Sequence, residues 1–348
     1  MKKQNWTWLL CFALLSTLGC GTSEPPPGDS PTVADAATEE LSEVDQAAEE
    51  TWATWEETED PEVKVGLARD FLERYPDSDH TGDFLGSGVY HYTESLDRPD
   101  EAYELVEMTL SKVEDPDARL EAQMQLAVLH SKTGRLDELS ALADTMAEEH
   151  SFQFTDHLRL MELATEAGAW NLVIEQAEDG MEFASLEAFK AQWPDYSNEY
   201  AARAGQRRNA YCKAYQGWAQ ANLGEHEAAL ASFSSGVEDT SYSLLGVDET
   251  PLHLYWGKTL TLKGDLEDAM GKLSVEALFG SKEAKEAYAE AWIATHGSEE
   301  GLEERLWALR QEHAKPLPQF ALPNYEGETF ESTEFIGDVM LIAAWNPT

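Results

Sequence analysis

Few residues of this chain have types and spacings that point to chemistry. Three cysteines are present, Cys11, Cys20 and Cys212, and a thiolate can attack a disulfide or bind a metal. Cys212 lies in a helix-forming stretch without a strongly electropositive neighbourhood, so we expect a small buried residue there rather than a nucleophile. The nine histidines occur at no HExxH or comparable metal-ligand spacing. The sequence therefore assigns no catalytic residue, no metal and no cofactor.

The N-terminus has the pattern of an export signal. Lys2 and Lys3 precede an apolar stretch, residues 6–18, which is too short to span a bilayer comfortably. The stretch runs into STLGC, which ends at Cys20 and resembles the lipobox of bacterial lipoproteins. The resemblance implies a signal peptide over residues 1–19, lipidation of Cys20, and an exported protein anchored to an envelope membrane on its periplasmic side. An ordinary cleaved signal and an uncleaved anchor are the alternatives.

A flexible tether and a strongly acidic composition follow. Residues 20–42 are rich in Pro, Gly, Ser and acids and carry few large apolar side chains, so we expect a disordered spacer after the lipidated cysteine. The formal net charge of −43 repels phosphate backbones. Nucleic acid is therefore excluded as a partner, and the charge itself is interpreted as a solvated surface.

Internal repeats dominate the middle of the chain. The stretch AYQGWAQANLGEHEAALASF has a small residue, a turn glycine, an alanine and a large apolar residue at offsets that LYWGKTLTLKGDLEDAMGKL repeats. These residues are Gly217, Gly224, Ala229 and Phe233 in the first stretch, and Gly257, Gly264, Ala269 and Leu273 in the second. The offsets resemble tetratricopeptide repeats, in which small residues let two helices pack closely. We expect Leu260, Leu262 and Leu266 to supply apolar faces of this hairpin.

Further copies extend the array. Gly134 and Gly168 lie 34 residues apart, which is the period of this repeat class. The stretch around Ala102 resembles an earlier copy. One hairpin cannot bury its apolar face alone, so about five copies between residues 43 and 312 are expected to stack into a tetratricopeptide-like helical solenoid. The surface of such a solenoid is expected to bind a protein or peptide partner.

One interruption breaks the period. Gly168 and Gly224 are separated by 56 residues, about twenty more than one repeat. The extra residues are interpreted either as a binding element or as a helix whose aromatic side chains pack on the solenoid, and the second interpretation is favoured. The insertion also carries the basic cluster Arg203, Arg207 and Arg208. These arginines are expected either to pair with neighbouring acids or to contact a carboxylate-bearing partner.

The composition changes after the helical region. Residues 313–348 contain several prolines, a turn glycine at Gly327 and a β-rich run, Val339–Trp345. Their order resembles the opening of a redoxin or TlpA-like thiol-disulfide oxidoreductase domain, which has a thioredoxin fold. In that family the strand leads into a CxxC at a helix N-terminus, and this sequence stops at Thr348, where that motif is due. The resemblance therefore implies an incomplete α/β fragment, whereas the alternative is a terminal strand that packs on the repeats.

The predicted fold class is mainly α, a tetratricopeptide-like solenoid followed by an incomplete thioredoxin-like α/β fragment. The leading functional hypothesis is a membrane-anchored envelope protein of the thiol-disulfide oxidoreductase type whose catalytic CxxC region is missing from this sequence. The alternatives are a non-catalytic repeat lipoprotein that binds a protein or peptide partner, and a purely architectural lipoprotein of the envelope.

Overall fold

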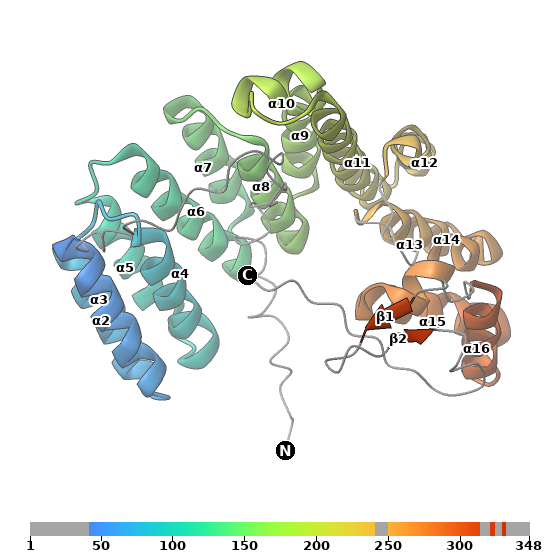
Figure 1. The fold of residues 1–348 in the computed structure, drawn as a ribbon, viewed down its shortest axis with the longest axis horizontal. Helices are drawn as coiled ribbons and strands as arrows, with labels where there is room; N and C mark the ends of the chain where they lie inside the picture. Colours follow the sequence, from blue (N-terminus) through green and yellow to red (C-terminus); the bar gives the residue numbers. More distant parts are fainter. Residues whose placement is uncertain (1–41, 241–249, 314–320, 324–328, 332–348) are drawn as a thin grey trace. The chain divides into compact units, whose positions relative to one another are not determined.

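The computed structural model describes residues 42–240, 250–313, 321–323 and 329–331 (Figure 1). By its contacts the chain divides into two units, residues 1–47 and 48–348. Only residues 42–47 of the first unit are described, and residues 43–47 belong to the first helix. The described part of the second unit is almost entirely helical, which confirms the mainly α fold class.

The helices follow one another with short connections, and most helices contact the next one in sequence. They are α2 (Glu43–Glu57), α3 (Pro61–Arg74), α4 (Thr81–Tyr90), the π-helix η1 (His91–Ser95), α5 (Pro99–Leu110), α6 (Pro116–Thr133), α7 (Leu136–Glu149), α8 (Phe154–Ala167), α9 (Trp170–Met181), the 3₁₀ turn η2 (Glu182–Ala184), α10 (Leu186–Gln192), α11 (Asn198–Asn222), α12 (His226–Gly236), the 3₁₀ turn η3 (Val237–Asp239), α13 (Leu252–Lys263), α14 (Leu266–Phe279), α15 (Lys282–His296) and α16 (Leu302–His313).

The same tight turn closes several of the helical hairpins. In each case one residue adopts a left-handed backbone and the next helix starts two residues later, a geometry that glycine allows without a Cβ clash. The residues are Asp97, Gly134, Gly168, Gly224 and Gly264, with φ values of 57°, 68°, 78°, 84° and 89°. Asp97 is the exception in residue type, and Asp tolerates this conformation better than most residues because its side chain is short and polar.

Close approach between the two helices of a hairpin depends on glycine at Gly217 and Gly257, and also at Gly88 of α4, where a Cβ would lie 2.6 Å from Leu105 of α5. A Cβ added to Gly217 on α11 would lie 2.6 Å from a ring carbon of Phe233 on α12. A Cβ on Gly257 of α13 would lie 2.3 Å from Leu273 of α14. Both large partners are fully buried, at 0% exposure. Because glycine has no side chain, the first helix leaves a space, and the large side chain of the second helix fills it.

The hairpins α6–α7 and α8–α9 fill the equivalent space differently. At the positions that correspond to Gly217 and Phe233, counted from the turn residue, they carry Ala127 with Ala143 and Met161 with Ala177. All four side chains are buried in one apolar cluster. Met161 with Ala177 keeps a summed volume close to that of Gly217 with Phe233, with the large side chain on the first helix instead of the second, whereas Ala127 with Ala143 is a smaller pair.

Burial of the leucines on α13 departs in part from expectation. Leu260 is 5% exposed, whereas Leu262 is 59% exposed, so the prediction that Leu262 faces the apolar interior was wrong. The reason is the helical period: Leu260 lies three residues after Gly257 on the packed face, and two further residues turn Leu262 away from it.

The insertion forms α10 and the first half of the long helix α11. Phe189 of α10 is buried with Ala201 and Ala204 of α11, and Trp193 and Tyr196 pack against this cluster. The aromatic side chains therefore pack on the helices, as the favoured interpretation of the insertion requires. This packing lengthens α11 to 25 residues.

Several predictions concern residues outside the described ranges. These are the signal peptide over residues 1–19, Cys20, almost all of the tether over residues 20–42, and the strand expected at Val339–Trp345. Beyond α16 the structure describes one antiparallel pairing, β1 (Ala321–Pro323) with β2 (Thr329–Glu331). No described helix is both long enough and apolar enough to cross a membrane.

Candidate functional site

Cys212 is the one cysteine within the described residues, and its surroundings make it inert. Its side chain is 0% exposed, and a Cβ on Gly180 of α9 would lie 3.1 Å from its sulfur. Burial raises the pKa of the thiol to about 12, so almost none of it is thiolate at neutral pH. Cys212 is a packing residue of α11 and offers no nucleophile.

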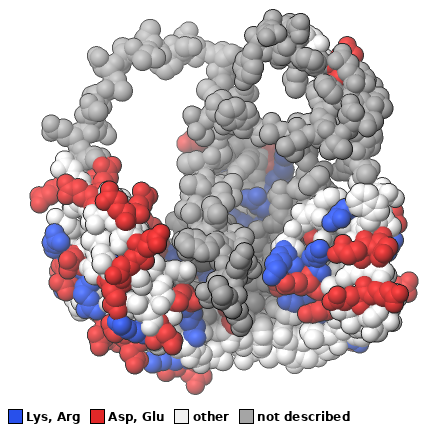
Figure 2. All heavy atoms as spheres, turned by 90° about the horizontal axis from the view of Figure 1, so that it is seen from below, with Lys and Arg blue, Asp and Glu red and all other residues white. Residues whose placement is uncertain are grey.

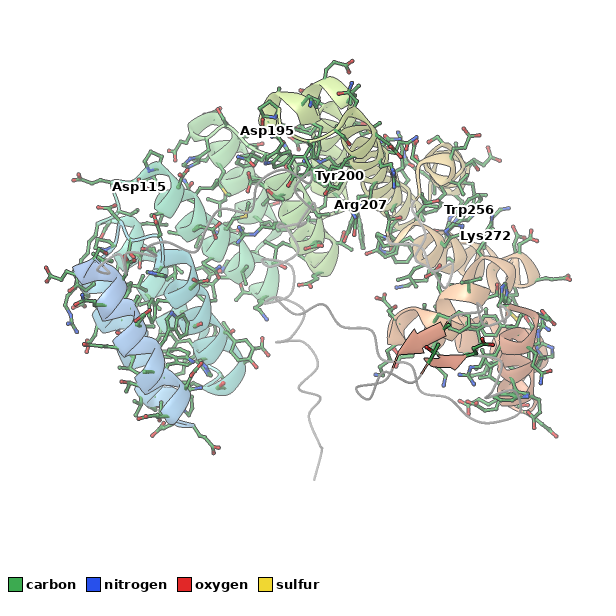
Figure 3. All side chains as sticks on the ribbon, in the orientation of Figure 1. Asp115, Asp195, Tyr200, Arg207, Trp256 and Lys272 are labelled. Carbon is green, nitrogen blue, oxygen red and sulfur yellow. The ribbon has the colours of Figure 1, made fainter. Side chains whose placement is uncertain are left out.

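The predicted arginine cluster is divided by the fold. Arg203 is exposed and pairs with Glu199 one helical turn earlier, and Arg207 is exposed on the same helix (Figure 3). Arg208 is only 7% exposed and donates to the carbonyl oxygen of Phe183 at 3.0 Å. The three residues therefore do not form one surface, and Arg208 does not reach a docking partner.

Arg208 instead holds the insertion in place. Its guanidinium lies 5.0 Å from the ring centroid of Phe154, 4.8 Å from Phe189 and 5.0 Å from Trp193. Burial and the neighbouring Arg207 lower its pKa to about 10, which still leaves it charged at neutral pH. A cation enclosed by three rings links α8 to α10 and α11.

The strongest candidate site is a row of aromatic side chains that crosses from α9 over α11 to α13. We call it the aromatic strip and define it as Trp170, Tyr215, Trp218 and Tyr255. The Trp170 and Trp218 centroids are 6.4 Å apart and edge-on, and Trp218 stacks on Tyr255 at 5.2 Å with an interplanar angle of 10°. Tyr215 meets Tyr255 edge-on at 5.5 Å. Trp170, Trp218 and Tyr255 are each partly exposed, so the strip presents aromatic surface to solvent.

Local structure explains why these four side chains meet. Trp170 is the first residue of α9, directly after the Gly168 turn. Tyr215 and Trp218 are three residues apart on α11 and therefore share a face. Tyr255 lies one turn into α13, which contacts α11. The strip thus depends on the hairpin turns and helix stacking described above.

Two carboxylates of α8 lie beside the strip. Glu162 is partly buried and Glu166, one turn later, is exposed. Burial and the Glu166 carboxylate raise the pKa of Glu162, and Arg159 and a hydrogen bond from the Tyr215 hydroxyl oppose the rise. The resulting pKa is about 7. Burial likewise raises the pKa of Tyr255 well above its ordinary value. Near neutral pH this face therefore holds a carboxyl group that is divided between its acid and its anion.

A lysine occupies the opposite end of the strip. The Lys258 ammonium lies 4.8 Å from the Trp218 centroid and 6.0 Å from the Tyr255 centroid. Its nitrogen is also 2.8 Å from a carboxylate oxygen of Glu283 on α15. The chain itself therefore places a cation on aromatic rings next to a carboxylate.

The polar face continues from α8 to α6 and α4. Arg159 donates two hydrogen bonds to Glu121 of α6, at 2.8 and 3.1 Å. A Cβ on Gly82 of α4 would lie 3.2 Å from the Glu121 side chain, so α4 approaches this pair closely. Arg159 is thus engaged by a bidentate ion pair and its guanidinium is directed to α6.

A hollow lies between α12, α13 and α14. This open groove of about 600 Å³ includes Leu230, Trp256, Leu260 and Lys272 in its wall. The Lys272 ammonium stands 3.7 Å from the Trp256 ring centroid (Figure 3). The lysine therefore covers one aromatic face in this groove.

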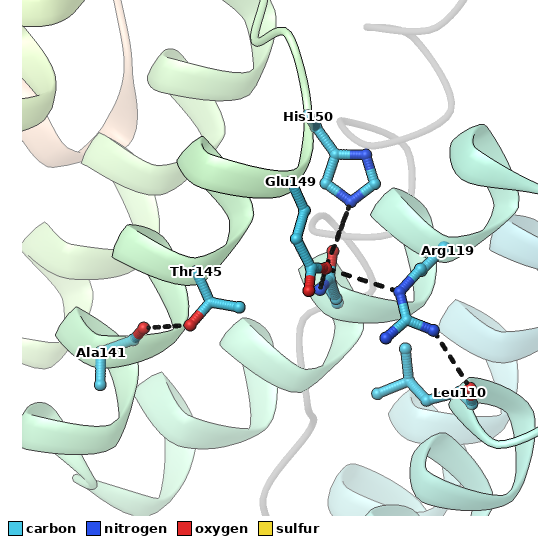
Figure 4. A network of polar contacts seen from close by, with 7 residues as sticks. Leu110, Arg119, Ala141, Thr145, Glu149 and His150 are labelled. Atoms are coloured by element: carbon cyan, nitrogen blue, oxygen red, sulfur yellow. Dashed lines mark hydrogen bonds and ion pairs between the residues drawn. The ribbon is translucent and has the colours of Figure 1, made fainter.

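A polar network joins α6 to the end of α7 (Figure 4). His150 lies 2.7 Å from the Gln123 side-chain oxygen, and the Gln123 amide donates to Glu149 at 2.8 Å. Arg119 approaches the same carboxylate at 3.5 Å. These contacts satisfy one another, and the network fixes the end of a hairpin.

Acidic side chains predominate among the coloured residues on the face that Figure 2 shows. Lysines and arginines lie among them, and many form ion pairs, as Lys132 does with Glu94. Among the described residues no group of three or more His, Cys, Asp or Glu side chains is arranged to hold a metal ion.

The repeat-signature residues selected from sequence are not part of the candidate site. Gly217, Gly224, Ala229, Phe233, Gly257, Gly264, Ala269, Gly134 and Gly168 form turns or hairpin interiors. Sequence reasoning missed the strip, although Tyr215 and Trp218 stand three residues apart around Gly217. That spacing placed both on one helix face, but it gave no sign of Tyr255 or of Glu162 beside them. Comparisons with protein-family models, curated proteins and solved structures found no match to this chain.

Proposed function

We propose that this chain is a non-catalytic, tetratricopeptide-like scaffold that binds a segment of a protein partner along the aromatic strip. The observation that carries the proposal is the partly exposed row of Trp170, Trp218 and Tyr255 beside Glu162 and Glu166. Tyrosine and tryptophan are the residues most enriched in binding hot spots, because they bury large areas at little cost in conformational entropy. The buried Cys212 supplies no competing catalytic group.

The repeats support this proposal physically. The turn that recurs at Gly134, Gly168, Gly224 and Gly264 sets successive hairpins in register. A binding face assembled from several such helices is already rigid, so a partner segment loses its own entropy but does not have to order the scaffold. We therefore favour binding over an architectural role that would use no particular face.

Selection of random displayed peptides on the purified full chain tests the proposal. Peptides that bind the strip are expected to bind the Trp218→Ala variant at least about tenfold more weakly. Trp307→Ala is the matched control, because Trp307 is 59% exposed on α16 and belongs to no described cluster. Trp170→Ala serves as a second strip variant, and circular dichroism checks that each variant is folded. If the selected peptides bind all variants equally, the strip is not the binding face.

We further propose the envelope location that the N-terminus implies, with Cys20 as the lipidated residue. The support is the apolar stretch that ends in STLGC. Expression in a bacterial host with an alkyne-labelled fatty acid should label the wild-type chain in the membrane fraction and leave Cys20→Ser unlabelled. Equal labelling of both chains would contradict the proposal.

A second candidate function is the thiol-disulfide oxidoreductase type. Its support is the antiparallel pairing of Ala321–Pro323 with Thr329–Glu331, which brackets Gly327 as the hairpin of a redoxin-like opening would. Sequencing the gene beyond codon 348 and assaying the longest product for insulin reduction tests it. A downstream CxxC with activity supports this function, and a product without either contradicts it.

A further inference from the structure

The carboxylates beside the strip are the feature that the packing does not explain. Neither Glu162 nor Glu166 forms an ion pair with any residue in the described ranges. Arg159 favours the charge of Glu162 but forms its ion pair with Glu121, and Lys258 pairs with Glu283. Keeping Glu162 ionised in this partly buried place costs free energy, because burial and Glu166 both oppose its charge.

The other end of the same strip shows how such a place is satisfied. There Lys258 rests on the Trp218 and Tyr255 rings and pairs with Glu283 at 2.8 Å. Rings, a carboxylate and a cation thus complete one another at that end. At the α8 end the rings and the carboxylates are present, and Arg159, which faces Glu162, forms its ion pair with Glu121 instead.

We propose that the partner segment is basic, and that one of its lysine or arginine side chains lies along the strip with its cation between Glu162 and Glu166. This inference rests on the proposed function and specifies its partner. The aliphatic stem of such a side chain packs on the rings, and the cation gains two carboxylates and the aromatic faces together. Charge complementarity favours this occupant over an acidic or neutral one, since the chain carries a net charge of −43.

Binding of a cation here must be linked to pH. The groups that face Glu162 are Glu166 and Arg159 of α8, Tyr215 of α11, and Tyr255 of α13. Glu162, with a pKa of about 7, changes charge in the neutral range. A cationic partner binds its anion, so affinity should rise by about tenfold between about pH 6 and about pH 8.

Fluorescence anisotropy with labelled peptides tests the inference. The probe is an Arg-Gly repeat peptide and the reference is its Gln-Gly counterpart, both titrated with the full chain at about 0.15 M salt to screen distant charges. We expect the Arg-Gly peptide to bind at least about tenfold more tightly than the Gln-Gly peptide. Its affinity should fall by about tenfold in the Glu162→Gln or the Glu166→Gln variant. Glu162→Gln should also remove the rise in affinity with pH.

A matched control separates this site from the general acidity of the chain. The double variant Glu148→Gln/Glu187→Gln removes two carboxylates, one more than either strip variant, from exposed positions on α7 and α10, and it should leave binding nearly unchanged. Equal losses in the control and in the strip variants would overturn the inference. Peptides that require Trp218 but not Glu162, Glu166 or a basic side chain would overturn the basic partner and leave the proposed function standing. Binding that requires neither Trp218 nor the carboxylates would overturn both.

Discussion

Two faces of the same helix, α11, differ in what their side chains do: one is closely packed and apolar, and the other carries aromatic and titratable groups. On one face Gly217 makes room for the buried ring of Phe233, and only the fit of volumes matters. On the other, Tyr215 and Trp218 meet Tyr255 and the Glu162 carboxyl, where titratable groups remain at partly exposed positions. The first arrangement stabilises the fold, whereas the second sacrifices some stability. This difference supports a binding role for the strip, because packing alone does not account for its titratable groups.

The interior face should show the largest effect on stability. Gly217→Met would drive a side chain into the Phe233 ring, and we expect the free energy of unfolding to fall by about 3 kcal/mol or more. Adding Phe233→Ala imitates the Met161–Ala177 pair of α8 and α9 and should restore a large part of the loss. Urea unfolding followed by circular dichroism measures both.

Gly66→Met is the control for helix propensity, because nothing lies within 4 Å of a Cβ at Gly66. It should leave the free energy of unfolding unchanged or raise it slightly. A loss at Gly66 as large as that at Gly217 would show that close packing is not the cause.

Substitution of the buried Arg208 should have the second-largest effect on the free energy of unfolding. Arg208→Ala leaves the Phe183 carbonyl without its donor and removes the charge from three rings, so we expect a loss of about 2–4 kcal/mol. Arg203→Ala changes an exposed pair on the same helix and should cost less than about 0.5 kcal/mol. Chemical denaturation compares them, and similar costs would contradict the anchoring role of Arg208.

The strip face should reveal itself in the pH dependence of stability. The pKa of Glu162 is raised by folding to about 7 from 4.5, so the folded state holds its proton more firmly than the unfolded chain does. Stability is therefore fullest below the unfolded pKa and falls as the pH rises through the folded one. The free energy of unfolding of Glu162→Gln, relative to that of wild type, should therefore increase by about 2 kcal/mol as the pH rises from about 5 to about 8.

Thermal unfolding across that pH range measures this difference between the two chains. Glu148→Gln, at an exposed position of α7, should follow the wild-type curve. A wild-type curve parallel to that of Glu162→Gln would show that Glu162 does not titrate as the strip requires.

The hairpin turns should show the smallest effects. Gly134→Ala places a Cβ on a left-handed backbone with φ 68° and should cost about 1 kcal/mol. Asp97→Gly, at φ 57°, should change stability by less than about 1 kcal/mol and in the favourable direction. Melting temperatures of the two variants measure the contrast. A loss of stability in Asp97→Gly as large as that in Gly134→Ala would mean that the two turns are not equivalent.

Much of the fold could be read from sequence because its signals are local. A glycine such as Gly224 predicts a turn, and Gly217 with Phe233 predicts a close helix contact, since both depend on spacing along one hairpin. The turn at Asp97 was missed because the residue with the left-handed backbone is not a glycine there. Leu262 was misplaced because neighbouring leucines on a helix face different ways.

The candidate site could not be read in the same way. Trp170, Trp218 and Tyr255 come from different hairpins, and only the stacking of α9, α11 and α13 brings them together. The state of Glu162 depends on burial, which no local pattern reports. The arginines that sequence singled out serve the insertion instead, because Arg208 is enclosed by aromatic rings.

The central claim, that the aromatic strip binds a basic segment, is tested most directly by hydrogen exchange. The full chain would be compared at about pH 8 with and without the Arg-Gly peptide, under conditions where Glu162 is ionised. Binding at the strip predicts slower exchange in α8, α11 and α13, Phe154–Ala167, Asn198–Asn222 and Leu252–Lys263. Unchanged exchange in these helices, or protection confined to the groove between α12 and α14, would contradict it.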